Sequence, residues 1–144
     1  MEPRRKKRQR KGTSEASSFM DTVRAAFIRW VALDKWREVD DLRTTVGMDL
    51  QQAIDEAGRF PNRGRYEPLW IERWKAEVRP ETTGVEAGGI FAAIEKAVAA
   101  ALEVEEAERK TRGDRPLEED AEFKAFVDSA LERLLREGDL GTSS

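Results

Sequence analysis

Residues 85–110 read VEAGGIFAAIEKAVAAALEVEEAERK, and this stretch does most to decide the fold. Its middle is rich in alanine, the residue with the highest helix propensity. Apolar residues recur in it at spacings of four and three, as in a coiled-coil seam: Ile90, Ile94, Ala97, Ala101 and Val104. The pattern predicts one long helix. We expect these residues to mediate self-association, and the alternative is that they pack on the last helix of the same chain.

Amphipathic periodicity predicts further helices on both sides of this stretch. They are expected at residues 18–31, 36–42, 50–57, 68–79 and 117–137. Proline and glycine mark the connections between them, and no alternating strand pattern occurs. The sequence therefore predicts an all-α fold, a compact bundle of five to six helices preceded by a disordered basic arm.

The chain divides into three predicted parts. Residues 1–17 form the arm, because polar side chains without large apolar neighbours cannot offset the entropy lost on ordering. Residues 18–140 form a single helical domain, within which we distinguish a tryptophan-rich unit (18–79) from a long helical hairpin (84–138). Residues 141–144 are expected to be a disordered tail.

The arm differs sharply in charge from the rest of the chain. Its first twelve residues, MEPRRKKRQRKG, hold seven cations: Arg4, Arg5, Lys6, Lys7, Arg8, Arg10 and Lys11. With Glu2 as the single acid they carry a net charge of +6, and since the whole chain carries −3, the remaining residues carry −9. Such a split is typical of an interaction tail rather than of part of a packed fold.

Clustered arginine and lysine on a flexible segment bind phosphates by releasing counterions, without reading sequence. We therefore predict a nucleic-acid partner, DNA or RNA. The alternatives for the same residues are a nuclear localisation signal, a solubilising tail, or contact with an anionic membrane. The membrane is least favoured, because no apolar residue or lipid anchor accompanies the charges.

A second basic stretch covers residues 59–79, RFPNRGRYEPLWIERWKAEVR. Its loop arginines, Arg59, Arg63 and Arg65, are candidate phosphate contacts. Trp70 and Trp74 are four residues apart and share a helix face. They are expected to pack inward on the aromatic residues of the first helix, although basic and aromatic residues together can also form a stacking platform for single strands.

A helix-turn-helix over residues 39–57, with Gly47 in the turn, is a weaker hypothesis. Only Gln51 and Gln52 of its second helix are suited to contact bases. The neighbouring acids would repel phosphates, which makes sequence-specific binding here the less favoured interpretation.

The chain has no histidine and no cysteine, which removes the commonest general base and metal ligands. We read the carboxylates of EVEEAERK and LEEDAEF as solvated helix faces and expect no metal or cofactor. An enzyme using the remaining polar residues would need a deep pocket. No apolar run approaches the roughly 20 residues that span a bilayer.

The sequence thus predicts a non-catalytic nucleic-acid-associated accessory or assembly protein, whose helical body binds protein partners or itself. The expected location is intracellular: cytoplasmic or nucleoid-associated, or nuclear in a eukaryotic host. The alternative is a helical adaptor without any nucleic-acid role, in which the arm is a localisation or solubility tag.

Overall fold

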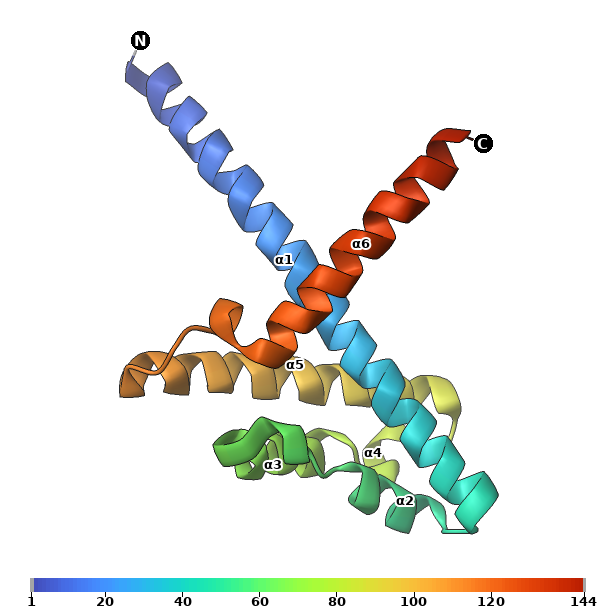
Figure 1. Cartoon of the computed structure of the whole chain (residues 1–144). Coiled ribbons are helices and arrows are strands. Elements are labelled where there is room, and N and C mark those ends of the chain that lie inside the picture. The colour runs from blue at the N-terminus through green and yellow to red at the C-terminus, as the bar shows by residue number, and fades with distance from the viewer. Residues whose placement is uncertain (1, 144) are drawn as a thin grey trace.

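The computed structural model describes the backbone of residues 2–143 and the side chains of residues 19–133, 135 and 136. Every regular element in this part of the chain is helical, which confirms the predicted all-α bundle (Figure 1). The α-helices are α1 (Glu2–Asp41), α2 (Leu50–Ala57), α3 (Glu67–Glu77), α4 (Pro80–Thr83), α5 (Ala87–Arg112) and α6 (Ala121–Ser143). Shorter helical turns are η1 (Leu42–Val46), η2 (Pro61–Tyr66) and η3 (Leu117–Glu119).

Some predictions fall on residues whose side chains lie outside the described part. These are the disordered basic arm at residues 1–17 and the disordered tail at residues 141–144, which remain predictions, as does the division into two sub-units. The predicted start of the first helix at Ser18 is wrong, because the backbone of α1 begins at Glu2.

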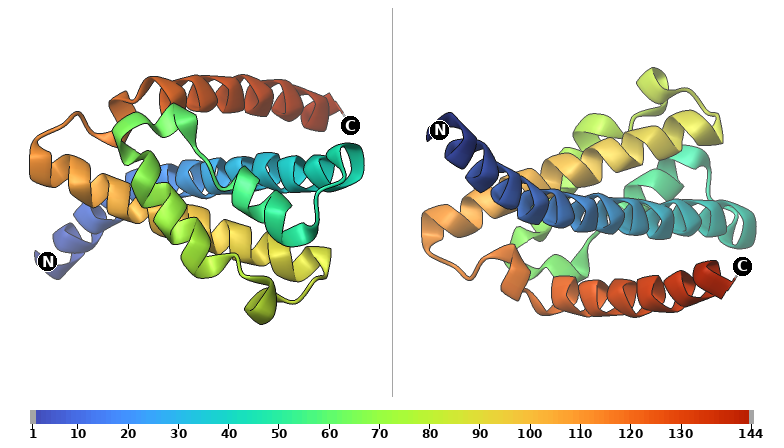
Figure 2. Two further views of the ribbon diagram at one scale, coloured as in Figure 1. Left: turned by 90° about the horizontal axis from the view of Figure 1, so that it is seen from below. Right: turned by 90° about the horizontal axis from the view of Figure 1, so that it is seen from above.

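Helix α5 is the central element, with α3 packed along one side of it and α1 along another. Seen from above and from below, α1 lies between α5 and α6 (Figure 2). The long helix predicted from the alanine-rich stretch is therefore present, but its main partners are α3 and α1 rather than the last helix.

The apolar stripe of α5 lies in the core of the single chain. Ile90, Ile94, Ala97 and Ala101 are at most 2% exposed, and Val104 is partly buried. Because this face is covered within the chain, it is not open to a second copy. The expected self-association seam is corrected to an intramolecular packing face.

Helix α3 buries both of its tryptophans, as the spacing predicted. Trp70 and Trp74 are each 1% exposed, and the ring of Phe60 packs on them with centroids 5.0 and 5.9 Å away. The indole N–H of Trp74 donates to the carbonyl of Ile54 at 2.8 Å. Gly58 makes room for this indole, since a Cβ there would lie 2.6 Å from the ring.

Helix α6 crosses α1 (Figure 1), and aromatic side chains pack between the two helices. Phe27 contacts Phe123 and Phe126 with ring centroids 5.2 and 5.5 Å apart, while Trp30 stacks on Phe126 at 5.2 Å. The aromatic residues of the first helix, expected to meet the α3 tryptophans, thus have their ring contacts with α6. Farther along α6, Leu135 is 72% exposed.

The turn between α1 and α2 contains Gly47 in a left-handed conformation (φ 87°), as the helix-turn-helix hypothesis requires. Helix α2 has only eight residues. Gln52 forms a capping box with Asp49, and Gln51 donates to Asp55 at 3.0 Å. Both glutamines are therefore bonded to acids of their own segment.

Candidate functional site

The most unusual feature of the interior is a buried carboxylate, Glu105 on α5, which is 0% exposed. Arg63 donates to both of its oxygens, through Nε at 3.1 Å and through Nη2. Arg109 donates from Nε at 2.9 Å, and the indole N–H of Trp70 donates at 2.8 Å. A buried charge is tolerated only when it is paired and hydrogen-bonded in this way.

Two further carboxylates extend this cluster to the start of α6. Glu122 accepts from Arg63, and Asp120 accepts from Arg109 at 2.8 Å. Asp120 also accepts from the backbone N–H groups of Glu122 and Phe123, at 3.0 and 3.1 Å. Ion pairs and a helix cap therefore fix the first turn of α6 against η2 and α5.

The surroundings of Arg63 and Asp120 favour the charged forms of these two residues. Burial alone would lower the pKa of Arg63, but hydrogen bonding and attraction from Glu105, with Glu122 nearby, raise that pKa above its ordinary value. Burial alone would raise the pKa of Asp120, yet the hydrogen bonds from Arg109 and from the Phe123 N–H hold it below the ordinary value. Opposite charges thus outweigh desolvation on both sides of the cluster.

The three loop arginines predicted to contact phosphate lie in three different surroundings. Arg63 is 6% exposed and bonded to two carboxylates, a placement that does not fit contact with phosphate. Arg65 is at the surface and pairs with Asp114 at 3.2 Å. Arg59 is exposed and lines an open groove.

The groove beside Arg59 has a volume of about 530 Å³ and mixed charge. Lys75 and Arg79 share it with Asp55 and Glu81, and Arg79 is paired with Glu81 at 2.8 Å. Arg59 and Lys75 are the groove cations with no side-chain ion pair among the described residues. Surface phosphate contact stays a prediction for Arg59 and Arg65.

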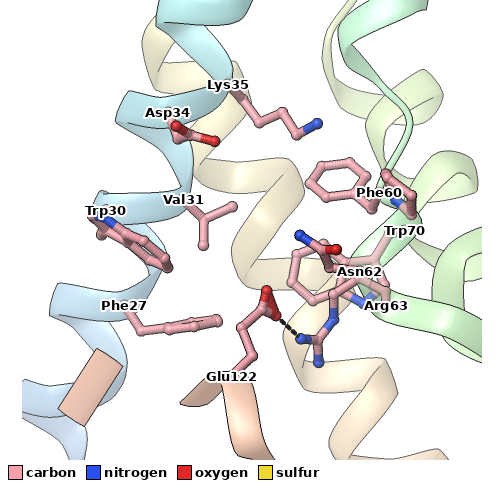
Figure 3. A pocket seen from close by; sticks show the side chains of 11 residues that line it. Phe27, Trp30, Val31, Asp34, Lys35, Phe60, Asn62, Arg63, Trp70 and Glu122 are labelled. Atoms are coloured by element: carbon pink, nitrogen blue, oxygen red, sulfur yellow. Dashed lines mark hydrogen bonds and ion pairs between the residues drawn. The ribbon is translucent and has the colours of Figure 1, made fainter. Parts of the chain in front are cut away.

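A smaller crevice of about 120 Å³ opens between α1, η2 and the start of α6 (Figure 3). Its lining includes aromatic residues and charged residues of both signs: Trp30, Asp34, Lys35, Phe60, Arg63 and Glu122. Small-molecule sites usually measure about 300–1,000 Å³. The crevice therefore has the size for one side chain rather than for a metabolite.

The charged cluster was missed at the level of sequence. Glu105, Asp120 and Glu122 were read as solvated carboxylates, whereas the first is fully buried and all three bind arginine. The position of Glu105 in the sequence could have indicated its burial, because Glu105 follows Ala101 by four residues on the apolar stripe and Arg109 follows by four more. A charged residue on a buried stripe implies a partner from elsewhere in the chain.

Comparison with protein-family models, with curated proteins and with solved structures gives no match. Among the described residues, no group of three or more acidic side chains is placed to hold a metal ion. Within the same part of the chain, no helix has the length and apolar character needed to cross a membrane.

Proposed function

We propose that the chain is a non-catalytic accessory or assembly protein that binds the phosphates of nucleic acid through its basic N-terminal segment. The observation that carries the proposal is the separation of charge, +6 in the first twelve residues against −9 in the remainder. An intracellular location accompanies this function.

The body supports the proposal because many of its cations already serve the fold. Arg63 and Arg109 are consumed by the Glu105 cluster, and Arg24 pairs with Glu106 at 2.6 Å. A cation paired with a carboxylate contributes little to phosphate binding, because the counterion that the phosphate releases is offset by the cation that the freed carboxylate takes up. Residues 4–11, by contrast, hold seven cations within eight positions, so we expect them to contribute most of the affinity for a polyphosphate.

The proposal predicts a steep dependence on salt. If all seven cations engage duplex phosphates, log K falls against log[salt] with a slope of about −6. Such binding reads no bases, so DNA duplexes of different sequence are expected to bind equally well.

The test is deletion of residues 1–12, with binding to a labelled duplex measured by fluorescence anisotropy over a range of salt concentrations. We expect the slope to approach zero while the helical circular dichroism of the body is unchanged. The matched control is Arg59→Gln with Arg65→Gln, which removes two exposed body cations and is expected to flatten the slope by about 2 at most. A deletion variant with an undiminished slope refutes the role of the segment.

A second candidate function is that of a protein–protein adaptor, and a separate observation favours it. Helices α1 and α6 each expose large apolar side chains: Trp30 and Leu33 on α1, and Leu131 and Leu135 on α6, each between 38% and 72% exposed. Exposed apolar patches often mark docking sites for other proteins. Purification from the native cell at moderate salt distinguishes the two, because an adaptor retains a protein partner and no nuclease-sensitive material.

A further inference from the structure

The crevice between α1 and α6 has walls suited to the stem of a long side chain. Trp30 stacks on Phe126 and is still 46% exposed, so part of its indole remains open to a further contact. Val31 and Phe60 line the interior (Figure 3). Indole is the aromatic group that attracts cations most strongly.

The charges of the crevice favour a cation over an anion. Its two cations are already engaged. Lys35 Nζ donates to the carbonyl of Arg59 at 2.5 Å and to Glu38 at 3.2 Å, and Arg63 is held by Glu105 and Glu122. The carboxylate of Asp34 on the rim, by contrast, has no hydrogen bond or ion pair among the described residues.

The charged side chains that line the crevice, taken together with the ion-pair networks they belong to, have the same sign. Three cations are opposed by five carboxylates: Lys35, Arg63 and Arg109 against Asp34, Glu38, Glu105, Asp120 and Glu122. An entering guanidinium or ammonium group meets an unpaired carboxylate beside an indole. An entering anion meets no free cation.

We propose that this crevice binds an arginine or lysine side chain from the basic N-terminal segment, residues 4–11, of a second copy of the chain. Charge complementarity identifies the occupant, since that segment carries seven cations and the rest of each copy carries −9. A bound cation packs its stem on Val31 and the indole of Trp30 and places its head group against Asp34.

The geometry of α1 assigns the segment to another copy. Helix α1 runs without a break from Glu2 to Asp41, and Lys11, the last of the seven cations, precedes Trp30 by nineteen residues, a rise of about 29 Å. In the same chain the seven cations would therefore have to turn back along the helix to reach the crevice. When the basic segment of one copy binds in the crevice of the next copy, the contact is head-to-tail. Contacts of this kind propagate into rings or filaments.

This contact has a regulatory consequence that rests on the proposed function. Nucleic acid and the crevice compete for the same cations, so binding of nucleic acid is expected to dissociate copies held together through their segments. The contact between segment and crevice does not itself depend on nucleic-acid binding, and it can be tested without any.

The test uses a fluorescein-labelled peptide of residues 2–12 and the chain lacking residues 1–12, titrated at low salt by fluorescence anisotropy. We expect saturable binding that Asp34→Asn weakens at least fivefold and that Trp30→Leu also weakens. The matched control is Asp40→Asn, an exposed acid on the same helix outside the crevice, which is expected to bind the peptide as the parent does. Circular dichroism of each variant verifies the fold.

Sedimentation of the full chain provides the second readout. We expect self-association at low salt that Asp34→Asn reduces and an added duplex reverses. The proposed binding in the crevice is refuted if the peptide shows no saturable binding, or if Asp34→Asn and Asp40→Asn weaken peptide binding equally. Peptide binding by a full chain that ignores nucleic acid leaves the crevice intact and refutes only the proposed function.

Discussion

Replacing Arg63 with methionine is the sharpest test of how this bundle is held together. The substitution keeps a long stem beside Trp70 but removes the guanidinium that donates to Glu105 and Glu122. Glu105 is fully buried and cannot recover its lost hydrogen bonds from water. Removing one partner of a buried ion pair costs about 3–5 kcal/mol.

The lower end of that range is expected here. Arg109 and the indole of Trp70 still donate to Glu105, so the buried carboxylate keeps part of its compensation. If the free energy of unfolding falls by about 3 kcal/mol and depends on urea with a slope of about 2 kcal/mol per molar, the unfolding midpoint moves down by about 1.5 M urea. Urea titrations followed by tryptophan fluorescence and by circular dichroism measure that shift.

The control lies two residues away in the same loop. Arg65 pairs with Asp114 at the surface and its side chain is 59% exposed, so Arg65→Met is expected to cost at most about 1 kcal/mol. In a double-mutant cycle, Arg63→Met and Glu105→Gln are expected to be less damaging together than the sum of their separate effects. If Arg63→Met and Arg65→Met unfold at the same urea concentration, Glu105 does not depend on Arg63 and the reasoning is refuted.

Two further outcomes follow from the packing and the charges. Gly58→Ala places a Cβ 2.6 Å from the Trp74 ring and is expected to destabilise the fold by about 1–3 kcal/mol. A Cβ added at Gly88 on α5 would have no atom of another segment within 4 Å. Gly88→Ala is therefore expected to be neutral or to stabilise the fold by up to about 1 kcal/mol, as measured in thermal melts. The folded state holds the pKa of Asp120 below its ordinary value, so the unfolded chain binds this proton first on acidification. The contribution of Asp120 to the free energy of unfolding is therefore complete above about pH 4 and is lost as pH falls further. Asp120→Asn is expected to flatten this part of a plot of urea midpoint against pH. An unchanged plot would contradict the role given to Asp120.

Local patterns carried most of the fold and little of the site. Alanine content and apolar spacing predicted α5, and the four-residue spacing of Trp70 and Trp74 predicted their burial. The Glu105 cluster depends on Arg63, which lies 42 residues away in the sequence. No helical periodicity reports a contact of that separation, so the same arginine was read as a surface cation.

The crevice was missed for the same physical reason. Asp34, Phe60 and Glu122 come from three segments, and their meeting depends on how α6 crosses α1. The self-association seam shows the converse error. A heptad-like stripe indicates that a helix has an apolar partner, but it does not say whether the partner belongs to the same molecule.

The burial of Glu105 also bears on how the chain reaches its native state. A partly assembled bundle that lacks either the loop bearing Arg63 or the second half of α5 buries the Glu105 carboxylate without enough hydrogen-bond donors. Such partial structures have a higher free energy than both the native and the fully unfolded chain, which favours all-or-none assembly. Only the complete set of segments supplies all the hydrogen-bond donors that the Glu105 carboxylate requires.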